Sequence, residues 1–304
     1  MKIAFIINSR VASKEKLSSL FSPFENDAFS ISYFETEYAG HAIHLAKNLK
    51  KENFDCIVSV GGDGTLNEIV NGLVNSDSKD DTIPSLAMFP VGTGNDFSLS
   101  IKTTKDPETL INAIKGQSFK AIDIGKITND GGEFRYFINV ADAGMGGEVT
   151  RKISTSGNTI GKWVYYSAIL QSFMTFKRPT LKIITQEMNF ESKVISVIIG
   201  NGISFGGGYR VVFDAKLNDG QFFIAVIGDI SILTYLSKLP QLMLGKRIEH
   251  PAVKYFHTKE IELINVSEHP CYLEMDGEPS YTCPVKIKCL PGMINFLDLE
   301  CLLV

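Results

Sequence analysis

Hydrophobic positions in roughly the first 125 residues alternate between short buried-strand runs and helical stripes. Apolar runs at residues 2–7, 55–60 and 85–90 predict strands. Two helices are expected between them, with apolar stripes over residues 42–49 and 66–73. After the third run, Asp106 and Pro107 are typical of an N-cap and a first helical residue, and Gly116 of a helix end. This β-α alternation predicts a parallel sheet with helices on both faces.

From about Asp123 the pattern changes to short runs separated by Gly, Pro, Asn and Asp. Residues 134–140 alternate between inward and outward positions, which predicts a strand. Further strands are expected at residues 181–185, 193–200, 209–213, 220–228, 260–266, 270–275 and 285–290. Only two helical patterns interrupt them, at residues 161–176 and 230–244. The second half is therefore expected to be antiparallel β, arranged as a sandwich.

Composition agrees with a soluble enzyme of two domains, because 304 residues are long for one core and 44% are hydrophobic. The net charge of -4 argues against a nucleic-acid binder and against a global attraction to anionic membranes. The five cysteines (Cys56, Cys271, Cys283, Cys289 and Cys301) form no C-x-x-C pair, so we expect reduced thiols in a cytosolic protein. The longest apolar region is broken by Asp229 and is too short to span a bilayer.

Two glycine-rich turns follow predicted strands. The first reads GGDGTLNEIVNGL from Gly61, and the second reads VGTGNDF from Val91. A turn that leads from a parallel strand into a helix points backbone N–H groups at one spot, which suits a phosphate. Neither standard nucleotide fingerprint is present. One such loop could be a tight strand-helix turn alone, but two loops after neighbouring strands favour a phosphate site.

Asp63 places a negative charge in the first turn, where it would repel a phosphate. A divalent cation between them, directly or through water, removes this conflict, as Mg²⁺ does in phosphoryl-transfer sites. Asp96 in the second turn and Asp123 at the domain junction could bind the same cation as Asp63. Each acid taken singly could be a cap or turn residue, so their number favours the metal.

Several motifs together resemble one family. The two turns, GKWVYY at residues 161–166, FGGGYRVVFDAKLNDGQF at residues 205–222 and LEMDGEP at residues 273–279 resemble the diacylglycerol kinase catalytic-domain family, which includes sphingosine, ceramide and bacterial lipid kinases. The resemblance covers nearly the whole chain. It implies a phosphofructokinase-like α/β domain over residues 1–123, to which residues 293–304 return, and a β-sandwich domain over residues 124–292, with ATP bound between them.

The resemblance also implies residue roles, carried over position by position. Nucleotide contacts are expected at Asn8, Ser9, Arg10, Thr36, Gly61, Gly62, Asp63, Gly64, Thr65, Leu66, Asn67 and Thr93. The first loop, NSRVASK, lacks the proline and glycine usual in the family, and Leu99 stands where many relatives have arginine. Lys162 is a candidate for positioning phosphates or a solvated side chain.

The late DGE element is where the family has its general base, so Asp276 and Glu278 are equal candidates for removing the hydroxyl proton. A turn around Gly277 could present both carboxylates, although an ordinary Asp-Gly hairpin would also explain it. In KLNDGQ, the resemblance implies a structural Mg²⁺ held by Asp219 and the carbonyls of Lys216 and Gln221; the ordinary alternative is a turn. His41 and His44 have no third ligand nearby and are read as surface residues.

The resemblance thus implies an ATP- and Mg²⁺-dependent lipid kinase that acts on diacylglycerol or a related lipid alcohol. It is expected at the cytoplasmic membrane surface, with no nucleic-acid partner and with a homodimer as an option. The alternatives are an NAD kinase, which shares the GGDGT turn, and an inactive nucleotide- or lipid-binding regulator. Lys238, Lys246 and Arg247 lie around an apolar segment that could touch a bilayer, although such a stripe is more often core packing.

Overall fold

The computed structural model describes residues 1–25, 29–74, 82–92, 94–155, 172 and 175–302. The chain divides into two compact units, one of residues 1–123 and 292–304 and one of residues 124–291. Two long strands, β5 (Phe119–Asn129) and β16 (Val285–Leu297), carry the chain from one unit to the other. Where these two strands pass between the units, Asp123 Oδ1 accepts a hydrogen bond from Gly292 N at 2.8 Å.

The first unit is a parallel sheet in the order β2-β1-β3-β4-β16. Its remaining strands are β1 (Lys2–Ile7), β2 (Ser30–Glu35), β3 (Cys56–Gly61) and β4 (Ser85–Pro90). Its helices are α1 (Lys14–Phe21), η1 (Ser22–Phe24), α2 (His41–Lys51), α3 (Asp63–Val74), η2 (Asp96–Leu99), α4 (Pro107–Lys115) and η3 (Leu299–Leu302). The predicted β-α alternation is confirmed.

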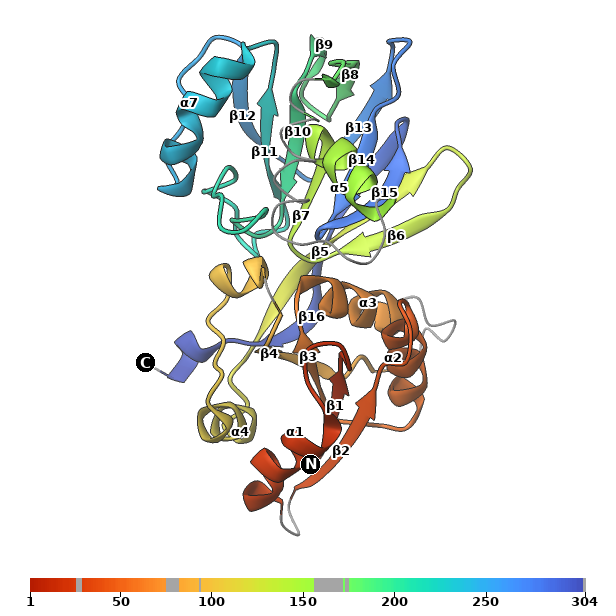
Figure 1. Ribbon diagram of the computed structural model, residues 1–304, viewed down its shortest axis with the longest axis vertical. Coiled ribbons are helices and arrows are strands. Elements are labelled where there is room, and N and C mark those ends of the chain that lie inside the picture. Colours follow the sequence, from red (N-terminus) through yellow and green to blue (C-terminus); the bar gives the residue numbers. More distant parts are fainter. Residues whose placement is uncertain (26–28, 75–81, 93, 156–171, 173–174, 303–304) are drawn as a thin grey trace. The chain divides into compact units, whose positions relative to one another are not determined.

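Helices cover both faces of this sheet, as expected for parallel strands (Figure 1). Helices α1 and α4 contribute to one apolar cluster with Ile3, Phe5 and Ile7 of β1. Helices α2 and α3 pack together on the other face (Figure 1). Helix α4 begins at the predicted N-cap, where Asp106 Oδ2 accepts from Thr109 N at 2.8 Å, and it ends at Gly116.

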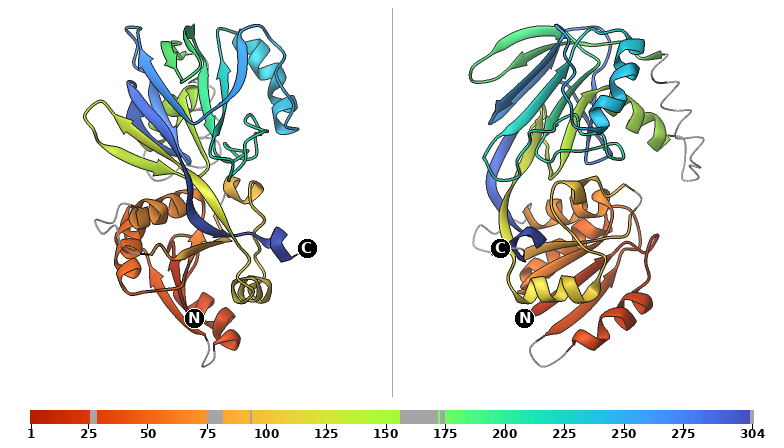
Figure 2. Two further views of the ribbon diagram at one scale, coloured as in Figure 1. Left: turned by 180° about the vertical axis from the view of Figure 1, so that it is seen from behind. Right: turned by 90° about the vertical axis from the view of Figure 1, so that its left-hand side faces the viewer.

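The second unit contains two antiparallel sheets. One has the order β12-β11-β10-β7-β14-β15. The other joins β16, β13, β8 and β9, and β5 pairs with β16 on one side and with β6 on the other (Figure 2). The strands are β6 (Phe134–Phe137), β7 (Val140–Gly144), β8 (Thr180–Ile184), β9 (Asn189–Lys193), β10 (Ser196–Gly200), β11 (Phe222–Ile227), β12 (Val253–Thr258), β13 (Glu260–Asn265), β14 (Tyr272–Met275) and β15 (Glu278–Thr282). Their facing sides share one apolar core, so the predicted sandwich is confirmed.

Two helices, α5 (Met145–Thr155) and α7 (Ile232–Met243), lie on the outer side of the sheet that runs from β12 to β15. Helix α7 matches the predicted pattern, whereas the helical pattern at residues 161–176 lies almost wholly outside the described residues. The strand predicted at residues 209–213 is wrong. Val211 and Val212 are buried there by turns that pack into the outer apolar cluster, so they need no strand partner. The four cysteines whose side chains are described are all free.

Candidate functional site

The loops predicted to hold a nucleotide follow β1, β2, β3 and β4 of the first unit. These strands are parallel and adjacent, so their carboxyl ends lie at one edge of the sheet. Asn8 follows β1, Thr36 follows β2, and the two glycine turns follow β3 and β4. Sequence positions up to about 90 residues apart are therefore gathered at one place.

Direct hydrogen bonds join the first three of these loops. Asn8 Nδ2 donates to Thr65 Oγ1 at 3.1 Å, and Ser9 Oγ donates to the Thr36 carbonyl at 2.5 Å. Asn8 Oδ1 also accepts from Arg10 N at 3.1 Å, which closes the loop locally. The first loop thus has a defined geometry although it lacks the family's proline and glycine.

The two glycine turns are in backbone contact. Gly92 N and Val91 N both donate to the Gly61 carbonyl, at 3.0 and 3.1 Å. A Cβ atom on Gly92 would lie 2.5 Å from the Gly62 Cα atom, and a Cβ atom on Gly61 would lie 2.5 Å from Thr65 Oγ1. Real Cβ atoms do not approach so closely, so the backbones can meet only because these residues are glycines.

Asp63 links the second turn to the first. Its Oδ2 accepts from Asp96 N at 2.9 Å, and its Oδ1 accepts from Phe97 N at 3.0 Å. Burial raises the pKa of the Asp63 carboxyl, the two backbone donors lower it, and the nearby Asp96 charge raises it. Asp63 therefore caps η2 and fixes the two glycine turns to one another.

Of the three acids proposed to bind a metal ion, Asp63 and Asp96 lie close together, whereas Asp123 has a different hydrogen-bond partner. A Cβ atom on Gly94 would lie 3.4 Å from Asp63 Oδ2 and 3.8 Å from Asp96 Oδ2, so these two carboxylates are close neighbours. Asp123 is buried and holds Gly292 N instead. Across the described ranges, no group of three or more His, Cys, Asp or Glu side chains could hold a metal ion.

Two residues expected to contact the nucleotide, Leu66 and Asn67, have buried side chains. The Leu66 side chain is fully buried, and its N–H donates to the Gly62 carbonyl at 3.2 Å. Asn67 is also buried, and its side-chain oxygen accepts from Asn71 Nδ2 at 3.1 Å. Both side chains therefore contribute to the packing of α3, and the nucleotide contacts expected at these two positions remain predictions. Thr93 and Lys162 lie outside the described residues.

In the second unit, the DGE element forms the tip of the β14–β15 hairpin. Asp276 and Gly277 have φ values of 49° and 83°, which is typical of a type I′ turn. The Asp276 carboxylate is buried and accepts from the backbone N–H groups of Ile138, Asn139 and Val140, at 2.9, 2.9 and 3.1 Å. The turn thus presents Glu278 to solvent, while Asp276 anchors the segment between β6 and β7.

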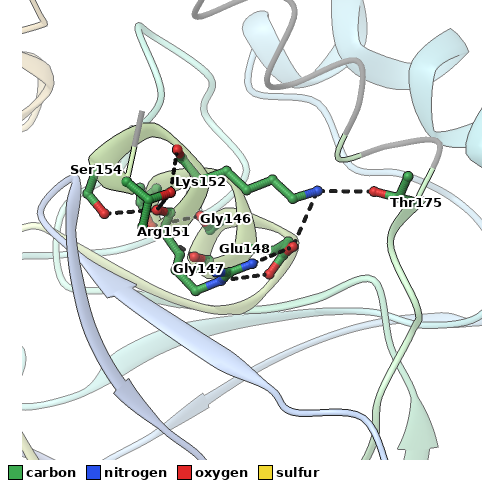
Figure 3. Close-up of polar contacts among 9 residues, drawn as sticks. Gly146, Gly147, Glu148, Arg151, Lys152, Ser154 and Thr175 are labelled. Carbon is green, nitrogen blue, oxygen red and sulfur yellow. Dashed lines mark hydrogen bonds and ion pairs between the residues drawn. The ribbon is translucent and has the colours of Figure 1, made fainter. Parts of the chain in front are cut away.

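Helix α5 packs against this hairpin, and Figure 3 shows the polar contacts along the helix itself. Glu148 accepts from Arg151 Nη2 at 3.1 Å and pairs with Lys152 Nζ at 3.3 Å. Lys152 Nζ also donates to Thr175 Oγ1 at 3.0 Å (Figure 3). The Arg151 guanidinium lies 4.7 Å from the centre of the Tyr272 ring on β14. Helix α5 was not predicted, and it supports the strand that leads to Glu278.

The loop proposed for a structural Mg²⁺ is a turn before β11. Asp219 is exposed, and its Oδ1 accepts from Gln221 N at 3.0 Å, with Gly220 at a φ of 73°. The carboxylate shapes the loop in the manner of an Asx turn. The roles expected for Asp219 and for the carbonyls of Lys216 and Gln221 remain predictions.

Comparison with known proteins decides the family. Residues 2–127 match the diacylglycerol kinase catalytic domain, and residues 139–298 match the YegS C-terminal NAD kinase beta sandwich-like domain. A diacylglycerol kinase of Staphylococcus aureus is 31% identical over 289 residues, which cover 94% of this chain and 85% of the relative. The chain belongs to the diacylglycerol kinase family. A diacylglycerol kinase of Bacillus subtilis is 29% identical over 91% of this chain and 90% of that relative.

The fold of this diacylglycerol kinase family member also matches a solved structure. The crystal structure of a diacylglycerol kinase from Bacillus anthracis superposes with a TM-score of 0.72 at 22% identity, covering 98% of this chain and 96% of that one. Of the helices in the described ranges, none has the length and apolarity to cross a bilayer.

Membership of a kinase family implies the use of ATP, and the first unit has features that fit a nucleotide phosphate. The first N–H groups of α3 have no acceptor within the helix, and the glycines beside them leave room for close approach. The neighbouring Asp63 and Asp96 fit Mg²⁺ held through water and phosphate oxygens, since that ion keeps several waters. They do not fit a cage made only of side chains.

The sequence analysis of this diacylglycerol kinase family member did not single out Asp142, a buried acid of the second unit. Asp142 on β7 is 2% exposed, and its Oδ2 accepts from Ser196 Oγ at 3.0 Å and Gly146 N at 2.9 Å. Its Oδ1 has no hydrogen-bond partner within the described part of the chain. Burial raises the pKa of the carboxyl to about 7, against the lowering effect of the two donors. The sequence signal was an aspartate inside an otherwise apolar strand.

Proposed function

We propose that this protein transfers the γ-phosphate of ATP to a hydroxyl of diacylglycerol or a related lipid alcohol, at the inner surface of the membrane. The observation that carries the proposal is the junction of the two glycine turns. Gly92 and Gly62 lie in close backbone contact there, and Asp63, which follows Gly62, accepts from Asp96 N and Phe97 N of the second turn. A phosphate site of this kind, within a diacylglycerol kinase catalytic domain, supports ATP as the donor.

In this proposal the first unit positions the nucleotide. The amides at the start of α3 bind phosphate oxygens, while Asn8, Ser9 and Thr36 fix the loops around them. Mg²⁺, when bound with ATP, neutralises the charge that develops on the phosphate oxygens. Asp63 and Asp96 would hold this ion through water, and the bonds from Asp96 N and Phe97 N keep the Asp63 carboxylate oriented.

The second unit supplies the base, and we assign that role to Glu278 rather than to Asp276. The Asp276 oxygens are occupied by three backbone N–H donors. Glu274 is buried too, and its Oε2 accepts from Gly277 N at 2.8 Å. Glu278 is the exposed acid of the element, so it can reach a lipid hydroxyl and take its proton as the oxygen attacks the phosphorus.

The test is phosphoryl transfer from radiolabelled ATP by the purified protein to a panel of lipid alcohols in detergent micelles, with NAD as a soluble acceptor. Labelling of diacylglycerol or another lipid alcohol supports the proposal. Labelling of NAD alone would establish the NAD kinase alternative. ATP binding without transfer to any acceptor would establish a regulator instead.

A pair of variants tests the base. Glu278→Gln keeps the size of the side chain but cannot accept the proton, so turnover should fall by about 10² to 10⁴. Glu268→Gln is the matched control, because Glu268 is another exposed glutamate of the second unit. Near-normal turnover of Glu278→Gln would refute the assignment.

A further inference from the structure

Helix α7 carries apolar side chains on the face that points away from the protein core. Leu233 is 80% exposed, and at the other end Met243 and Leu244 are 53% and 70% exposed. Leu242 is fully buried in the outer apolar cluster, together with part of Tyr235. In Figure 1 the helix lies at the margin of the second unit, beside β11 and β12.

Helical geometry places Leu233 and Leu244 on one stripe, with Met243 at its edge. At about 100° per residue, Leu233 and Leu244 differ by only about 20° around the axis, and Leu242 lies opposite Leu233. Ser237 and Pro240 fall on the same stripe and are also exposed. A surface helix normally places charged residues there, yet this stripe has none. The sequence alone favoured core packing for this apolar segment, and the structure shows that part of it is not in the core.

Cations surround the carboxyl end of the stripe. Residues 230–248 contain Lys238, Lys246 and Arg247 and no acidic residue, and the exposed acids Asp229 and Glu249 flank this stretch. The Arg247 guanidinium lies 5.4 Å from the ring centre of Tyr255, so its position is fixed by packing. Arg210 is exposed beside the same turn, where its N–H donates to the Leu242 carbonyl at 3.1 Å.

An apolar stripe ending in a cluster of positive charge is complementary to an anionic bilayer, whose surface combines acyl chains with negative headgroups. A second copy of the chain fits less well, because a twofold contact through this stripe would bring like charges together. We infer that the α7 surface, defined as Leu233, Met243, Leu244, Lys246 and Arg247, docks the protein onto an anionic lipid bilayer. The reason for membrane docking rests on the proposed lipid substrate, whereas the binding experiment that tests it needs no substrate.

The experiment is co-sedimentation of the full chain with phosphatidylcholine vesicles, with and without phosphatidylglycerol and without diacylglycerol or ATP. Wild-type protein should bind the anionic vesicles more tightly, and added salt should weaken binding. Lys246→Gln with Arg247→Gln should reduce binding about fivefold for each cation removed. Leu244→Asp should reduce it at least as much, and Leu244→Ala should have a smaller effect.

Matched controls come from another helix. Lys16 and Leu20 on α1 are an exposed cation and a 42% exposed leucine, so Lys16→Gln and Leu20→Asp should leave binding unchanged. Unchanged binding of the α7 variants, or an equal loss in the α1 variants, would overturn the inference. So would a dimer, measured by light scattering, that Leu244→Asp dissociates. Because no phosphoryl transfer is measured, a failed kinase assay would leave this result standing.

Discussion

Asp142 offers a quantitative prediction, because its carboxyl is buried among apolar side chains. Its pKa is raised from the ordinary value of 3.8 to about 7, chiefly by burial. At 1.36 kcal/mol per unit, ionisation in the folded state costs about 4 kcal/mol. The folded chain binds this proton more tightly than the unfolded chain. The resulting stability is therefore fully present below pH 3.8 and is lost as the pH rises through about 7.

The perturbation is Asp142→Asn. An amide oxygen can still accept from Ser196 and Gly146, but the side chain no longer ionises. The variant should gain stability over wild type as the pH rises, by about 3 kcal/mol between roughly pH 5 and pH 8. Urea unfolding followed by circular dichroism measures this difference in the transition of the second unit.

Asp130→Asn is the matched control for this measurement, since Asp130 is an exposed aspartate of the same unit. Its stability relative to wild type should not change in the same way with pH. If the difference between wild type and Asp142→Asn were independent of pH, or if wild type gained on the variant as pH rose, the reasoning from burial would be refuted.

Three further substitutions follow from contacts in the two units. Asp276→Ala leaves three backbone N–H groups without their acceptor, so the second unit should lose about 3 kcal/mol or more in urea unfolding; an unchanged midpoint would contradict the anchoring role. Gly92→Ala forces a Cβ atom against Gly62, so ATP affinity by calorimetry should fall at least tenfold, and wild-type affinity would exclude the phosphate site. Thr65→Val removes the acceptor of Asn8 Nδ2 and should cost the first unit about 1 kcal/mol, which a thermal melt would detect.

The first unit could be predicted well because its determinants are local. The apolar runs and the Asp106-Pro107 start of α4 each act within a few residues, and parallel pairing then places every strand's carboxyl end at one edge. The neighbouring positions of the two glycine turns followed from this, since Gly62 and Gly92 come after neighbouring strands. Their direct contact was not foreseeable, because it depends on how closely two loops approach.

Long-range contacts explain what the sequence could not predict in the second unit. Whether Asp276 faces solvent depends on N–H groups 136 to 138 residues earlier in the chain. Helix α5 starts with Gly146 and Gly147, which disfavour a helix locally. Both are required by their surroundings, since a Cβ atom would collide with Asp142 at one and with the Tyr272 carbonyl at the other. Tertiary packing therefore determines this helix against its local propensity.

The hydrogen bonds of Asp63 affect how a loss of turnover in the Asp63→Asn variant should be interpreted. Both of its oxygens accept backbone N–H groups, and an asparagine at this position can offer only one acceptor. Asp63→Asn should therefore abolish turnover and also destabilise the first unit by about 2 kcal/mol. Glu278 is exposed, so Glu278→Gln should abolish turnover with no loss of stability.

Measuring kinetics and urea unfolding on both variants separates positioning from chemistry. A stable Asp63→Asn protein without activity would mean that the carboxylate acts mainly through the metal and its water. A destabilised one whose Mg²⁺ dependence matches wild type would mean that it acts by holding the two glycine turns together. The structure favours both roles together. The Asp63 carboxylate binds Asp96 N and Phe97 N of the second turn, and near Gly94 it also lies close to the Asp96 carboxylate, with which it could share a metal ion.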